Sequence, residues 1–118
     1  MSSSPMTILL DIDGTILSHP SSLSNCIADK QNVLPGVKEK FACWSRQSYC
    51  IILITARPES MRSLTVKQIE NAGLYFDHLI MGLPNGPRVL INDSKPSADT
   101  TAFAYTVKRD AGLEAFKC

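Results

Sequence analysis

The sequence predicts an α/β domain of Rossmann-like type, with three layers and a mostly parallel sheet of about five strands. Two observations lead to this prediction. Apolar runs of strand length alternate with helical patterns in the earlier part of the chain, and the runs themselves show little alternation of polar and apolar residues. Unalternated strands are typical of parallel sheets, which are covered on both faces.

Five short apolar runs have the length and the flanking residues expected of strands. They cover 7–11, 50–54, 77–81, 88–91 and 102–107.

Two helices are predicted between the first three of these strands. Pro35 introduces a helix over 36–48, because proline is tolerated at a helix start, where its missing N–H loses no partner. Pro58 and Glu59 introduce the next helix in the same way, and Gly73 is a plausible stop.

The chain of 118 residues is expected to form one domain, 1–118, without a cap domain. We expect its start, 1–6, to be flexible and residues 18–34 to form a loop or flap. No apolar run is long enough to span a bilayer, and 1–6 lacks the pattern of a secretion signal. These features favour a cytoplasmic protein that does not enter the membrane.

Charge and cysteine content exclude other classes. The formal net charge is +1 and the basic residues are scattered, so the sequence carries no nucleic-acid signature. The four cysteines include no C-x-x-C pair, which argues against a zinc or redox motif. Cys43 and Cys50 are interpreted as buried thiols, and Cys118 as incidental.

Polar residues follow three of the predicted strands: Asp11 onward, Thr55 onward, and Asn92 with Asp93. Ligands of open α/β sheets bind beyond the carboxyl ends of the strands. We therefore expect these three clusters to meet at one edge of the sheet and form a site.

The segment from Asp11 to Thr15, Asp-Ile-Asp-Gly-Thr, is the sharpest signal of chemistry. Two acids two positions apart at a strand end can hold a divalent cation such as Mg²⁺. Gly14 allows a sharp turn that brings backbone N–H groups close to an anion. An Asp-Gly surface turn is the alternative interpretation.

Residues 8–15 resemble the first motif of the haloacid dehalogenase-like (HAD) superfamily, an apolar strand followed by D-x-D-G-T. Residues 51–55 resemble its second motif, and 90–93 its fourth. The resemblance covers nearly the whole chain and implies a small, capless, Mg²⁺-dependent phosphatase.

The resemblance also implies roles for individual residues. Asp11 would attack phosphorus and form an aspartyl phosphate, and Asp13 would act as general acid and then general base. Thr55 would donate a hydrogen bond to phosphate, although it can equally cap the following helix. The other residues expected to bind substrate or phosphate are Gly14, Thr15, Ala56 and Arg57. The residues expected to bind Mg²⁺ are Asp11, Asp13 through its backbone carbonyl, Asn92 and Asp93.

The third motif is the departure from the family pattern. Capless relatives often have Gly-Lys-Pro before the fourth strand, and this chain has Gly82-Leu83-Pro84. We favour Lys95 as the substitute cation, with Arg88 and Lys67 as alternatives.

The expected partner is a phosphorylated substrate, either a small molecule such as a sugar phosphate or a macromolecule, because a capless site is open. Such a site also suggests a homo-oligomer. The competing interpretation is a catalytically weak binding or regulatory module with the same fold. A receiver-like signalling domain is disfavoured, because receivers place the accepting aspartate at the third strand.

Overall fold

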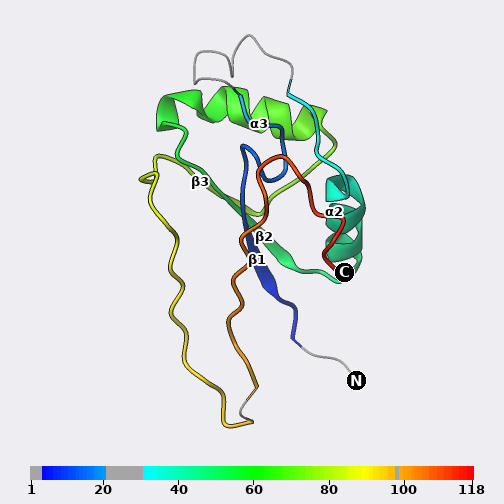
Figure 1. Cartoon of the computed structure of the whole chain (residues 1–118), viewed down its shortest axis with the longest axis vertical. Helices are drawn as coiled ribbons and strands as arrows, with labels where there is room; N and C mark the ends of the chain where they lie inside the picture. The colour runs from blue at the N-terminus through cyan, green and yellow to red at the C-terminus, as the bar shows by residue number, and fades with distance from the viewer. Residues whose placement is uncertain (1–3, 21–30, 98) are drawn as a thin grey trace.

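The computed structural model describes residues 4–20, 31–97 and 99–118. Parts of two expected segments, the flexible start 1–6 and the loop 18–34, therefore lie outside the described residues. The described chain forms a small α/β domain with a parallel sheet in the order β1-β2-β3 (Figure 1). Its elements are β1 (Thr7–Asp11), α2 (Val37–Arg46), β2 (Cys50–Ile54), the 3₁₀ turn η1 (Glu59–Met61), α3 (Arg62–Asn71) and β3 (His78–Ile80).

The three strands end together at one edge of the sheet. Asp11 lies beside Ile54, and Ile54 lies beside Ile80. The first three predicted strands and their common carboxyl edge are thus confirmed, since this register places the residues that follow Asp11 and Ile54 next to each other.

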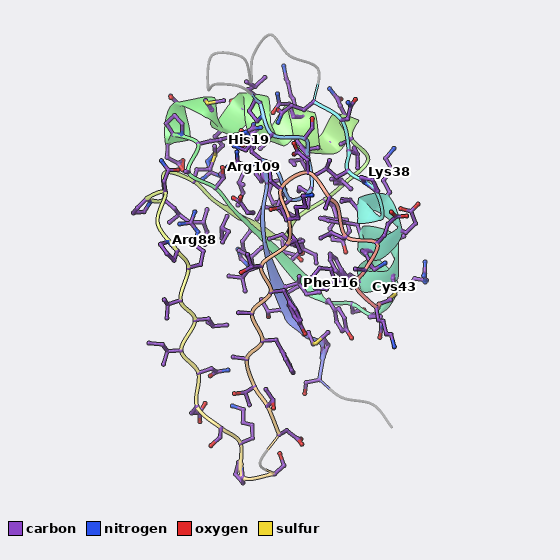
Figure 2. All side chains as sticks on the ribbon, in the orientation of Figure 1. His19, Lys38, Cys43, Arg88, Arg109 and Phe116 are labelled. Atoms are coloured by element: carbon purple, nitrogen blue, oxygen red, sulfur yellow. A yellow bond between two sulfur atoms is a disulfide. The ribbon has the colours of Figure 1, made fainter. Side chains whose placement is uncertain are left out.

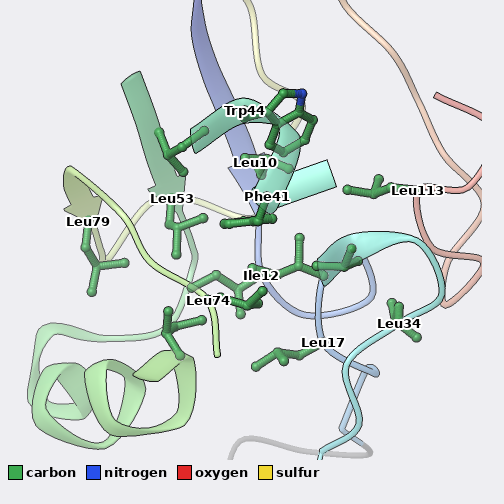
Figure 3. Close-up of a cluster of buried hydrophobic side chains, with 14 of the residues drawn as sticks. Leu10, Ile12, Leu17, Leu34, Phe41, Trp44, Leu53, Leu74, Leu79 and Leu113 are labelled. Carbon is green, nitrogen blue, oxygen red and sulfur yellow. The ribbon is translucent and has the colours of Figure 1, made fainter. Parts of the chain in front are cut away.

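The hydrophobic core lies on one face of this sheet. The register aligns Leu10, Leu53 and Leu79 in a row across the three strands, and all three are buried. Figure 3 shows these side chains packed together with Phe41 and Trp44 of α2. Burial of such large apolar side chains is the main stabilising contribution to the domain.

Both helices turn an apolar stripe toward this core. Val37, Phe41 and Trp44 are buried at helical spacing along α2, which confirms the predicted helix over 36–48. The second predicted helix begins as η1 and continues as α3, where Thr65 and Ile69 are buried.

The opposite face of the sheet remains largely uncovered. Leu9 is 46% exposed and Ile80 is 44% exposed, and the side chains of Ile52 and Ile54 on this face are only half-buried. The described part of the chain therefore has two layers, and the expected third layer is absent from it.

The two last predicted strands are wrong. Residues 83–97 and 99–107 contain no strand. We call these residues the arm. Figure 1 shows the arm leaving the end of β3, running back past the sheet and returning toward the domain. Its two limbs are joined where Asn92 Nδ2 donates to Thr101 O (3.2 Å) and Thr101 Oγ1 donates to Asp93 O (2.6 Å).

The length of the connection explains why 88–91 does not continue the parallel sheet. A strand parallel to β1 would have to begin at the amino edge, but the chain leaves β3 at the carboxyl edge. Parallel strands need a crossover of about a dozen or more residues, usually with a helix. Only 81–87 separate β3 from Arg88, and this segment contains no helix.

The C-terminal segment is tied to α2. Cys43 and Cys118 form a disulfide with their Cα atoms 6.1 Å apart, and Cys50 is a half-buried free thiol. The interpretation of Cys43 as a free thiol and of Cys118 as incidental is therefore wrong. The sequence separation of 75 residues hides this pairing from any local pattern. None of the helices in the described ranges is long and apolar enough to cross a membrane.

Candidate active site

The chain turns sharply directly after β1. The backbone N–H groups of Thr15, Ile16 and Leu17 all donate to Ile12 O, and Gly14 N donates to Leu17 O at 2.7 Å. Gly14 has a φ of 85°, in the left-handed region that favours glycine. The turn N–H groups of Gly14 and Thr15, which we expected to bind phosphate, thus have acceptors within the turn itself.

A C-terminal segment packs against this turn. Asp110 N donates to Gly14 O at 2.9 Å, and Asp110 Oδ1 accepts a hydrogen bond from His19 N at 2.8 Å. A Cβ atom at Gly14 would lie 3.1 Å from Arg109 Cγ. Figure 2 shows Arg109 and His19 next to each other at this end of the sheet. The side chains of His19 and Arg109 therefore lie against the turn at Gly14.

Thr55 follows β2 at the same edge and is buried. Its Oγ1 accepts a hydrogen bond from Arg57 N at 3.0 Å, and its backbone N–H donates to Ile80 O. The hydroxyl thus caps the turn that leads into η1. Ala56 is half-buried within that turn.

Arg57 is the most heavily bonded side chain of the site. It is only 1% exposed, and each of its five N–H donors has an acceptor. Nε and Nη2 donate to Asp13 Oδ2 (2.9 Å) and Oδ1 (2.7 Å). The remaining donors bind Thr65 Oγ1, Gln68 Oε1 and Gln31 Oε1. Its position at the end of β2 therefore joins the turn after β1 to α3.

Asp13 is held from two sides. Arg57 binds both of its carboxylate oxygens, and Gln31 Nε2 donates to Oδ1 at 2.8 Å. Bidentate pairs of this kind fix the orientation of a carboxylate as well as its charge. The Asp13 side chain keeps 17% of its surface exposed, so it still borders solvent at the mouth of the site.

Asp11 has a different environment. It makes no ion pair with another described residue. Desolvation by the surrounding chain raises the pKa of its carboxyl group, and the charge of Asp13 raises it further. A hydrogen bond from the Ile12 backbone and the charges of Arg88 and His19 lower this pKa, but less strongly than burial raises it.

The three candidate cations lie in different places. Arg88 is close enough for its charge to lower the pKa of Asp11, and its Nη1 donates to Pro84 O and Gly86 O. Lys95 is exposed on the arm and pairs with Asp93 at 3.6 Å. Lys67 is exposed on α3. Of the three candidates, Arg88 is therefore the one whose charge acts on Asp11.

Asn92 and Asp93 lie on the arm and not beside Asp11. Both are exposed, and their described contacts are with Thr101, with each other and with Lys95. Sequence order suggested a strand that would end at the common edge, but the short connection after β3 leads the chain away from that edge.

A single chain does not fit the expected Mg²⁺ ligand set. Within the described ranges, no group of three His, Cys, Asp or Glu side chains is placed so that it could hold a metal ion. Asp11 is available at the end of β1, but Asn92 and Asp93 lie elsewhere, on the arm.

Three residues at or beside the segment from Asp11 to Gly14 were not predicted from the sequence. They are His19, Gln31 and Arg109. His19 and Gln31 belong to an unpatterned loop, and Arg109 is separated from Asp11 by most of the chain. No local signal marks them, since only tertiary packing brings them to this edge.

No protein family, curated protein sequence or solved structure matches this chain.

Proposed function

We propose that this chain hydrolyses phosphomonoesters through an aspartyl phosphate formed on Asp11, as its resemblance to the HAD superfamily implies. The observation that carries the proposal is the contrast between two neighbouring carboxylates. Asp11 stands at the carboxyl end of β1 without an ion-pair partner among the described residues, whereas Arg57 fixes Asp13. One acid is thereby left available for attack and the other is oriented.

In the proposed reaction, an Asp11 carboxylate oxygen attacks phosphorus as the ester P–O bond breaks, and the leaving alkoxide takes up a proton. Water then hydrolyses the acyl phosphate, which releases inorganic phosphate and restores the carboxylate. Arg88 offsets negative charge at Asp11, since its charge opposes the burial that raises the pKa of that carboxyl. Thr55 keeps its hydroxyl hydrogen available, because Oγ1 acts as an acceptor toward Arg57 N.

Asp13 is proposed to deliver the proton to the leaving group and to recover it from water. Both of its oxygens accept hydrogen bonds from Arg57, so this role requires one of those bonds to be released during the reaction. Mg²⁺ remains the proposed cofactor, with Asp11 as one ligand. Two of the other expected ligands, Asn92 and Asp93, lie away from Asp11 in one chain.

The binding or regulatory module is the second candidate, and the same two observations favour it. The carboxylate of Asp13 already accepts three hydrogen bonds, and Asn92 and Asp93 lie away from Asp11. Such a module would bind a phosphorylated ligand without turning it over.

The deciding experiment is hydrolysis of an aryl phosphate by the purified full chain, with Mg²⁺ and with a chelator. We expect Mg²⁺-dependent turnover that Asp11→Asn abolishes, since an amide is a poor nucleophile of similar size. Glu70→Gln is the matched control, because it removes a carboxylate charge from the exposed surface of α3 and should leave the rate unchanged. An inactive wild-type protein that still binds inorganic phosphate would favour the module.

A further inference from the structure

The arm carries an apolar segment that no other described part of the chain covers. Val89 is 82% exposed, Leu90 is 60% exposed and Ile91 is 89% exposed. Three consecutive residues of this type have high strand propensity and a strong tendency to be buried. A large contiguous exposed apolar segment marks a surface that is covered in the functional state.

The sheet has an unpaired edge that can accept such a segment as a further strand. Among the described residues, β1 pairs only with β2, so its other edge has free backbone groups. An unpaired edge is a template for a further strand, and proteins usually block it with charged residues or proline. The segment Thr7–Leu10 of β1 contains neither. Its Leu9 side chain is partly exposed on the uncovered face.

The chain cannot cover its exposed apolar segment and pair the free edge of β1 by folding its own arm onto β1 while also bringing Asn92 and Asp93 to Asp11. The connection 81–87 is too short for a parallel crossover, as argued above. An antiparallel pairing within one chain would carry Asn92 and Asp93 toward the amino edge, away from Asp11. Figure 1 shows that the first limb of the arm does run opposite to β1.

A second copy of the chain removes this conflict. A twofold axis perpendicular to β1 reverses, in the partner, the direction of every segment that runs along β1. The first limb of the partner's arm therefore runs parallel to β1 of the first copy. Its apolar residues reach the free edge first, and the Asn-Asp pair that follows them arrives at the carboxyl end, where Asp11 lies.

We propose that two copies of this chain exchange their arms. Val89, Leu90 and Ile91 of each copy add a strand to the free edge of β1 in the other. Asn92 and Asp93 then complete the site around Asp11 of the other copy. The completion of the site rests on the proposed function, whereas the exchange rests on the exposed surfaces alone. The same exchange accounts for the ligands that a single chain leaves unassembled.

The first test measures the mass of the full chain in solution by sedimentation equilibrium at micromolar concentration. We expect a dimer for the wild type, and a folded monomer by circular dichroism for Ile91→Asp, because an exposed side chain supports nothing within its own chain. Leu9→Asp should weaken the dimer from the other side of the interface. Ala42→Asp, which places the same charge on an exposed alanine of α2, should remain dimeric. A monomeric wild type, or a dimeric Ile91→Asp, overturns the exchange.

The second test asks whether the site is shared. Chains with Asp11→Asn and chains with Asn92→Ala and Asp93→Ala are expressed together under two affinity tags, and the mixed dimers are isolated. In the exchanged dimer one of the two sites is intact, so we expect about half of the wild-type aryl phosphatase rate, although each variant alone is inactive. Inactive mixed dimers beside an active wild type would show that the ligands act within one chain.

A readout independent of turnover separates this proposal from the proposed function. Mn²⁺ binding is followed by the loss of the free-ion signal in electron paramagnetic resonance. We expect wild-type and mixed dimers to bind Mn²⁺ and each single variant to lose binding. If the wild type binds Mn²⁺ as a dimer but has no turnover, the phosphatase proposal fails and the exchange stands. If the wild type binds Mn²⁺ and the mixed dimers do not, the exchange fails.

Discussion

Arg57 donates two parallel hydrogen bonds to the carboxylate of Asp13, from Nε to Oδ2 at 2.9 Å and from Nη2 to Oδ1 at 2.7 Å. The guanidinium is almost completely buried, while the carboxylate keeps one side toward solvent. The pair connects the end of β1 to the end of β2 and, through Thr65, to α3. The pair therefore holds these elements together, and it also restricts the orientation of Asp13, the proposed acid–base residue.

Arg57→Met should destabilise the domain by about 3 kcal/mol, because removing one partner of a buried pair leaves the other charge and several polar groups uncompensated. Urea unfolding measures this loss. Arg62→Met is the matched control, since Arg62 makes a similar two-bond contact with Glu59 at the surface. Exposed pairs contribute little, so the control should unfold near the wild-type midpoint. Equal losses in the two variants would contradict the structural role of Arg57.

Asp11→Asn should stabilise the domain at neutral pH. Burial raises the pKa of Asp11 in the folded state, so folding is favoured when the carboxyl is protonated, and this contribution is lost as pH rises through the raised pKa. The asparagine avoids that loss. Thermal unfolding at pH 7 should therefore favour the variant, and the difference should shrink as pH falls toward the ordinary value of 3.8. A difference that does not depend on pH would contradict this origin.

Arg88→Gln should lower the phosphatase rate about 10²-fold, in line with the loss of one electrostatic stabiliser beside the reacting group. Because the charge of Arg88 lowers the pKa of Asp11, its removal raises that pKa further. The acidic limb of the pH–rate profile should accordingly move to higher pH. Lys67→Gln, which removes an exposed charge from α3, serves as the control and should change neither quantity. An unshifted limb with a lowered rate would assign Arg88 a role other than acting on Asp11.

Cys118→Ser should destabilise the oxidised protein by about 2–4 kcal/mol, because the disulfide to Cys43 closes a long loop and restricts the unfolded chain. Urea unfolding with and without reductant measures the effect. Cys50→Ser is the matched control, since Cys50 is free and its substitution should not make stability depend on the reductant. A wild-type midpoint unaffected by reductant would contradict a stabilising disulfide.

The apolar runs and the prolines that introduce the helices were sufficient to predict three strands, two helices and the common carboxyl edge. These features depend on local propensity and on periodicity, both of which are present in consecutive residues. Asp11 and Asp13 were predicted at the end of β1 for the same reason. The strand expected over 88–91 has the right composition, but composition does not report whether the preceding connection is long enough to deliver it.

Tertiary structure alone decided the environments of the site residues. The sequence by itself determined that an Asp-x-Asp-Gly-Thr turn follows a buried strand and that Arg57 begins the turn after the next one. It did not determine that Arg57 points inward to Asp13, that His19 and Arg109 meet beside Gly14, or that Asn92 and Asp93 lie on an arm. Those outcomes depend on contacts between residues far apart in the chain, where burial and charge compensation outweigh any local preference.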